Sequence, residues 1–209
     1  MAAARRRTAP MPWLKLGIFL GGLVPLASVV VRGLDGSLSA NPIAEAENEL
    51  GLAALVFLVA ALGCTPARQL WGWTWPARVR RELGLFAFFY ASVHFATYLF
   101  LDRAIDLGSV LDDVVERPFI TAGFAALVLL TPLAITSTSG WVKRLGYRHW
   151  QRLHRLVYLA GGLAALHFIW RVKVDLSQPA VYATAIAVLL LVRLAFRLWK
   201  PRARARATA

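Results

Sequence analysis

An all-α, polytopic membrane helix bundle is the fold class that this sequence predicts, and two observations support it. Hydrophobic residues make up 58% of the 209 residues, and the mean hydropathy is +0.57. Charged residues make up only 17% and lie mainly between long apolar segments. A soluble domain of this length would instead spread its charges along the exposed faces of its helices.

Six apolar segments approach the roughly 20 residues that a helix needs to cross a bilayer. They are residues 14–31, 50–65, 83–101, 119–136, 153–170 and 179–199, of which the second is the shortest. The first follows Arg5, Arg6 and Arg7, as the apolar core of a signal sequence does, but it ends in Val-Val-Val-Arg without a small-residue cleavage site. We therefore predict a retained anchor and six transmembrane helices.

The segments that connect the predicted spans alternate in charge. Basic residues gather before residue 16 and at 68–81, 143–152 and 200–206, whereas the connections at 35–49, 102–116 and 171–175 are acidic or mixed. Positively charged loops stay on the cytoplasmic side of a membrane. We therefore expect both termini in the cytoplasm, with residues 1–12 and 200–209 as basic cytoplasmic tails and residues 13–199 as one transmembrane domain.

Several classes of protein are excluded by charge, motif and cysteine content. The formal net charge of +13 would suit a nucleic-acid-binding protein, but topology and anionic lipid headgroups account for basic residues that flank membrane spans. The single cysteine, Cys64, excludes an intrachain disulfide and a cysteine-ligated iron–sulfur cluster. The sequence contains neither a G-x-G-x-x-G unit nor a P-loop, so an internal NADPH route is excluded.

Three of the four histidines, His94, His154 and His167, lie inside predicted spans. An ionisable side chain in hydrocarbon is costly unless it faces the bundle interior and has a partner, so these histidines are candidates for function. No cluster of cysteine or carboxylate ligands accompanies them, and this favours haem iron over other metals. His149 lies in a connecting loop, where we expect no such role.

Residue counting predicts how the histidines are used. His94 and His167 lie at similar depth in the outer halves of the third and fifth spans, so we expect them to bind one haem iron from its two axial sides. Small neighbours, among them Ala91, Gly162 and Ala164, are expected to make room for the macrocycle.

His154 lies 13 residues before His167, about 20 Å along a helix, so it cannot share that iron. It either snorkels toward the cytoplasm or holds a second, inner cofactor with no histidine opposite. An uninterrupted helix would turn the two rings about 140° apart, so the fifth span is expected to be central, to bend, or to face different neighbours at its two ends. The arginines expected to pair with the anionic groups of an inner cofactor are Arg80, Arg81 and Arg155.

Several motifs together resemble the MsrQ (YedZ) family, and they occur in order over nearly the whole chain. The motifs are Arg-Arg-Glu-Leu-Gly-Leu-Phe-Ala-Phe-Phe-Tyr-Ala-Ser-Val-His at residues 80–94, Glu-Arg-Pro-Phe-Ile-Thr at 116–121, Pro-Leu-Ala-Ile-Thr-Ser at 132–137, Trp-Gln-Arg-Leu-His-Arg-Leu-Val-Tyr at 150–158, Trp-Arg-Val-Lys at 170–173 after His167, and Asn-Pro-Ile at 41–43.

The resemblance implies a ferric-reductase-like transmembrane haem domain over residues 13–199, with haem b as the cofactor and one or two haems bound. It also implies flavin mononucleotide, which is attributed to the family. Electrons would come from the quinone pool or a cytoplasmic flavin reductase and pass across the bacterial inner membrane. The acceptor would be MsrP, a periplasmic molybdopterin enzyme that reduces methionine sulfoxide in oxidised proteins. Sulfoxide reduction itself is expected in that partner.

Two alternatives are compatible with the sequence at this point. One is a free-standing membrane ferric or quinone reductase with the same haem core, which activity without a periplasmic partner would identify. The other is a small transporter or assembly factor with buried histidines, which a visible spectrum would separate from a cytochrome. The sequence has no inverted repeat and no pair of interrupted spans, and this argues against the transporter.

Overall fold

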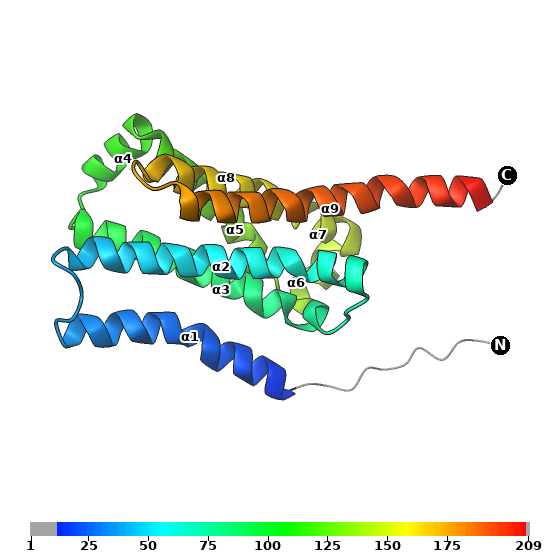
Figure 1. The fold of residues 1–209 in the computed structure, drawn as a ribbon, viewed down its shortest axis with the longest axis horizontal. Helices are drawn as coiled ribbons and strands as arrows, with labels where there is room; N and C mark the ends of the chain where they lie inside the picture. Colours follow the sequence, from blue (N-terminus) through cyan, green and yellow to red (C-terminus); the bar gives the residue numbers. More distant parts are fainter. Residues whose placement is uncertain (1–11, 208–209) are drawn as a thin grey trace.

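The computed structural model describes residues 12–207, with side chains for residues 12–199, and every regular element in this range is helical (Figure 1). The elements are α1 (Pro12–Leu34), α2 (Pro42–Trp71), α3 (Pro76–Thr97) with its π-helical extension η1 (Tyr98–Asp102), α4 (Leu107–Glu116), α5 (Pro118–Ile135), α6 (Ser139–Leu145), α7 (Tyr147–Leu153), α8 (Leu156–Arg171) and α9 (Ser177–Ala207). Within the described residues, six helical segments are long and apolar enough to cross a membrane. The predicted all-α, six-span fold is therefore confirmed. The predicted basic tails are residues 1–12 and 200–209. Apart from residue 12, they lie outside the range whose side chains the structure describes.

The long helices lie side by side, with α1 at one edge of the bundle (Figure 1). The α1–α2 connection and α4 lie at one end, and α6 and α7 lie at the other. These two ends are called the α4 end and the α6 end below. α2 packs along α3, α5 packs along α8, and α9 covers parts of α2 and α8. The centre of the bundle is apolar and includes the buried residues Leu62, Ala87, Leu130, Ala160 and Ile186.

α2 extends well beyond the predicted span of residues 50–65, because its first turns are polar and the sequence pattern did not include them. Asn41 caps the helix, since its side chain accepts a hydrogen bond from the backbone N–H of Ala44 at 3.2 Å, and Pro42 occupies the first turn, where no N–H is needed. The Asn-Pro-Ile sequence is therefore a helix start.

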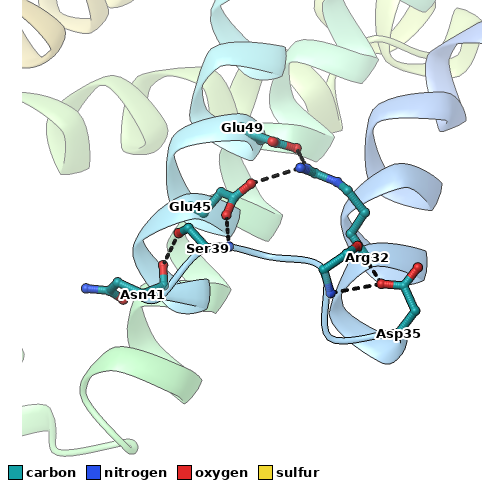
Figure 2. Close-up of polar contacts among 7 residues, drawn as sticks. Arg32, Asp35, Ser39, Asn41, Glu45 and Glu49 are labelled. Carbon is teal, nitrogen blue, oxygen red and sulfur yellow. Dashed lines mark hydrogen bonds and ion pairs between the residues drawn. The ribbon is translucent and has the colours of Figure 1, made fainter.

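Arg32 of α1 holds these polar turns of α2 in place (Figure 2). Its guanidinium donates to Glu45 at 2.8 Å and also to Glu49, while the backbone N–H of Ser39 donates to Glu45 at 2.5 Å. In the same connection, the hydroxyl and N–H of Ser37 donate to the Asp35 carboxylate and lower the pKa of that carboxyl below its usual value. The α1–α2 connection is thus an ordered, charge-paired corner at the α4 end.

α1 docks on α3 at the turn that contains Pro25. Pro25 has no N–H, so the helix is weakened at this point. The hydroxyl of Tyr90, a fully buried residue of α3, accepts from the N–H of Leu26 at 3.2 Å and donates to the carbonyl of Gly22 at 2.5 Å. Gly22 leaves room for the ring of Phe86, which any Cβ at this position would strike.

α9 is attached to α2 at a second proline. Pro66 lacks the N–H that would otherwise bond to the carbonyl of Leu62. A guanidinium N–H of Arg193 in α9 donates to that carbonyl instead. Arg193 also donates to the Tyr158 hydroxyl at 3.0 Å and lies over its ring. A charged side chain inside a predicted span therefore has partners, as its cost in a bilayer requires.

Replacement of Tyr90 by Phe should loosen α1 from the bundle. The change keeps the ring but removes the hydroxyl from two backbone groups in a buried site, a loss worth about 1–3 kcal/mol. We expect the detergent-solubilised variant to melt a few degrees below the wild type, whereas Tyr147→Phe, at an exposed position, should melt normally. Equal melting temperatures for Tyr90→Phe and the wild type would show that the hydroxyl does not hold α1.

Candidate functional site

Two of the three candidate histidines face each other across the bundle. His94 lies on α3 and His167 on α8. The centroids of their imidazole rings are 6.2 Å apart, and the ring planes differ in orientation by 76°. The two residues are far apart in the sequence, so the packing of the α2–α3 pair against the α5–α8 pair brings them together.

A backbone carbonyl on the neighbouring helix orients each of these rings. His94 Nδ1 lies 2.8 Å from the carbonyl oxygen of Glu47 on α2, and His167 Nδ1 lies 2.7 Å from that of Phe119 on α5. A carbonyl oxygen only accepts hydrogen bonds, so each Nδ1 carries the proton and donates it. Each Nε2 then keeps a lone pair, which is the tautomer of a metal-ligating histidine with its other nitrogen fixed by a carbonyl.

A glycine faces each ring, one helical turn after each of these carbonyls. A Cβ on Gly51 would lie 3.2 Å from the His94 ring, and a Cβ on Gly123 would lie 2.6 Å from Nδ1 of His167. The same three-part arrangement of histidine, carbonyl and glycine therefore occurs once between α2 and α3 and once between α5 and α8. Sequence reasoning missed both glycines, although an isolated glycine inside an apolar helix is a signal of close packing.

The two histidines line a cavity of about 330 Å³, a size at the lower end of the range for cofactor pockets. Its walls are mostly apolar and include Leu55, Ala87 and Leu130. The expected small residues Ala91 and Ala164 also line it, whereas Gly162 is exposed. Charged residues line it as well, and these are Glu47, Asp102, Arg103, Arg117 and Arg171.

The separation of the two rings fits an iron atom held between them. A first-row metal binds an imidazole nitrogen at about 2.0–2.1 Å, so the centroids of two imidazoles on opposite sides of one ion are about 6.3 Å apart. Among the described residues, no group of three or more His, Cys, Asp or Glu side chains could hold a bare metal ion. Two histidines alone suit an ion whose other ligands come from a macrocycle, which is the situation of haem iron.

His154 lies away from this cavity, just after α7 and before α8. Its Nε2 is 3.1 Å from the hydroxyl oxygen of Thr136, and its ring centroid is 4.0 Å from that of Trp150. Thr136 donates its only hydroxyl proton to the carbonyl of Pro132 at 2.6 Å, so Nε2 of His154 donates and Nδ1 keeps the lone pair. Of the three arrangements expected for the fifth span, the structure shows the bend, as a break between α7 and α8 at this histidine.

The arginines expected beside His154 are exposed at the α6 end, and they are Arg80, Arg81 and Arg155. Arg80 donates to the hydroxyl of Thr65 at 3.5 Å and is near enough to His154 to act on it electrostatically. None of the three lines the cavity between His94 and His167. Three other arginines do so, and sequence reasoning assigned them no role: Arg103, Arg117 and Arg171.

Most of the candidate site lies in a range that matches a known family of transmembrane proteins. Residues 49–165, which run from α2 into α8, match the family described as ferric reductase like transmembrane component. This range contains His94, His154 and both glycines, and it ends just before His167. The membrane-spanning helices and this match identify a multi-pass membrane protein.

Similar proteins cover most of the chain. The protein-methionine-sulfoxide reductase heme-binding subunit MsrQ of Deinococcus radiodurans is 51% identical over 90% of this chain and 93% of its own length. The protein of the same name from Rhodospirillum rubrum is 49% identical over 86% of both chains, and that of Herminiimonas arsenicoxydans is 48% identical over 94% of this chain and 90% of its own. This chain therefore belongs to the ferric reductase like transmembrane component family and, within the proteins compared, to the MsrQ family.

Proposed function

We propose that this chain is a b-type cytochrome subunit that passes electrons across a membrane to a methionine sulfoxide reductase. The observation that carries the proposal is the His94–His167 pair, whose rings are 6.2 Å apart in a mostly apolar cavity. The names of the relatives, each a heme-binding subunit of a protein-methionine-sulfoxide reductase, support both the cofactor and the system. These names do not mention flavin mononucleotide, and we propose haem alone at this cavity.

The residues of this chain would act by holding iron and excluding water. When bound, haem supplies a centre that accepts and releases one electron at a time. Nε2 of His94 and Nε2 of His167 would bind the iron, and the carbonyls of Glu47 and Phe119 would keep both rings in that orientation. With two histidine nitrogens as its protein ligands, the iron would be suited to electron transfer rather than to binding of a substrate.

Loop charges support an orientation in the bacterial inner membrane. The α6 end carries the basic connections, so we place it in the cytoplasm and the α4 end in the periplasm. The electron donor would be the quinone pool or a cytoplasmic flavin reductase. The acceptor would be a periplasmic molybdopterin enzyme of the MsrP kind.

Acidic residues at the α4 end would help to orient such a partner by electrostatic steering. Asp102, Asp106, Asp112 and Glu116 are exposed there. Asp113, which belongs to the same predicted acidic loop, is buried instead and pairs with Arg103 and Arg117. Its role is therefore internal to the fold.

Replacement of either axial histidine by Ala should abolish the low-spin haem signal and the delivery of electrons. Each change removes one of the two protein ligands, so haem should be lost or become five-coordinate and high-spin. Visible and electron paramagnetic resonance spectra of the purified variants measure this, and His149→Ala at an exposed position is the control. If His94→Ala and His167→Ala both kept a full complement of haem with unchanged spectra, the pairing would be wrong.

The two glycines should be nearly as important as the histidines. Gly123→Ala places a methyl group against Nδ1 of His167, and Gly51→Ala crowds His94 less closely. We expect a severe loss of bound haem in Gly123→Ala and a smaller loss in Gly51→Ala. Gly63→Ala is the matched control on α2, because a Cβ there meets nothing within 4 Å. Equal haem content per protein in all three variants would contradict the assigned role of the glycines.

We also propose that His154 holds an inner cofactor near the cytoplasmic face. Its support is distance, because a lone haem at the α4 end would leave much of the hydrocarbon core, about 30 Å thick, between itself and a donor at the α6 end. Tunnelling needs a closer relay, and His154 lies roughly 20 Å inward of His167 along the span. Its Nδ1 is the nitrogen free to act as a ligand, and Arg80 lies nearby.

Replacement of His154 by Ala should distinguish the role of the inner site from that of the site between His94 and His167. The spectrum of the haem on His94 and His167 should be preserved, because His154 does not line that cavity. Its reduction by a donor on the cytoplasmic side should stop, which stopped-flow absorption on proteoliposomes measures. A normal rate of reduction would make His154 a structural residue that joins Thr136 and Trp150 at the break between α7 and α8.

A further inference from the structure

We propose that Arg171 anchors a carboxylate at the α4 end of the cavity, and that this carboxylate is a propionate of the haem between His94 and His167. This inference rests on the proposed function. It assigns a ligand to a cationic side chain that the fold leaves without a partner inside the candidate site.

The other two arginines that line the cavity are already engaged. Arg103 pairs with Asp113 at 2.5 Å and with Asp102 at 3.3 Å. Arg117 pairs with the other oxygen of Asp113 at 3.0 Å, and the Tyr98 hydroxyl donates to Asp113 at 2.6 Å. Both oxygens of Asp113 are thus paired where α4 meets the ends of α3 and α5, and each of these two arginines has a carboxylate partner.

Arg171 differs from both. Across the part of the chain with described side chains, it forms no hydrogen bond and no ion pair, although it is only partly exposed and lines the cavity. It lies one helical turn after His167, which places it on the same face of α8. It is near enough to His94, His167 and Glu47 to act on them electrostatically, but no carboxylate reaches it.

An unpaired guanidinium next to an apolar cavity in a membrane protein is costly. A carboxylate carried by the group between the histidines would remove that cost, because a guanidinium binds a carboxylate through two parallel hydrogen bonds. Glu47 has a buried carboxylate oxygen without a hydrogen-bond partner on the same cavity, yet it forms no ion pair with Arg171. These two opposite charges therefore line the cavity without forming an ion pair, so Arg171 has no carboxylate partner among the described side chains.

The first experiment changes the charge of residue 171 in the full chain, purified in detergent. Arg171→Gln should release haem to apomyoglobin roughly 10- to 100-fold faster, as expected for loss of a charge-assisted hydrogen bond. It should also lower the haem midpoint potential, because a nearby positive charge favours the reduced, more negative iron centre. Arg171→Lys should keep the potential near that of the wild type and lose haem at an intermediate rate, because it keeps the charge but not the paired hydrogen bonds. Lys173→Gln, an exposed cation two residues away that does not line the cavity, is the matched control and should change neither quantity.

The second experiment identifies the source of the carboxylate. Chains produced under haem limitation are reconstituted with haem or with its dimethyl ester, in which both propionates are uncharged. The ester should weaken binding to the wild type but cause little further weakening in Arg171→Gln, since a contact that is already lost cannot be lost again. Equal weakening in both proteins would overturn the propionate assignment. A wild-type midpoint potential that depends on added acetate would also overturn it, in favour of a free carboxylate from solution.

These experiments distinguish a failure of this inference from a failure of the proposed function. If the wild type binds haem through His94 and His167 but Arg171→Gln keeps the wild-type potential and haem-release rate, only the role of Arg171 is wrong. If the wild type binds no haem, or the histidine variants keep it, the proposed function fails first.

Discussion

The hydrogen bond from each histidine Nδ1 to a carbonyl of the adjacent helix is the interaction on which the candidate site depends. It selects the tautomer, fixes the ring direction and sets the distance between the paired helices at one depth. Such a bond brings each ring close to the backbone of the neighbouring helix. Gly51 and Gly123, one turn after the accepting carbonyls, leave the space that each ring occupies.

The outer helices of the bundle obey a related constraint, which is that a broken helical hydrogen bond needs another partner in the absence of water. Beside Pro25, Tyr90 bonds to the N–H of Leu26 and to the carbonyl of Gly22. Beside Pro66, Arg193 donates to the carbonyl of Leu62, which the proline leaves without a donor. These contacts attach α1 and α9, the two helices that lie outside the matched family range of residues 49–165. The additional helices are therefore tied to the matched unit through specific polar contacts as well as through apolar packing.

The sequence alone was sufficient to predict six spans and the similar depth of His94 and His167. The length of apolar segments and the constant rise of a helix determine both. It was not sufficient for the glycine partners, since helices that are apolar nearly all round carry no periodic signal for which face meets which neighbour. It also grouped Asp113 with the other acidic residues of the connection at residues 102–116. The aspartate is buried because Tyr98, Arg103 and Arg117 converge on it from other segments, and a one-dimensional charge pattern does not contain that convergence. The long first turns of α2 were missed for the same reason, since their glutamates are paired by Arg32 of another helix.

The repetition of one arrangement in two helix pairs has a thermodynamic consequence. The α2–α3 pair and the α5–α8 pair each contribute one ring to the cavity, so neither pair alone forms a complete binding site. Any group that bonds to both rings acts as a cross-link between two halves of the bundle, and it stabilises only the state in which they are docked. By mass action, the fraction of correctly assembled chains then rises with the free concentration of that group. The supply of that group would thereby influence how many chains hold the two helix pairs in the docked arrangement.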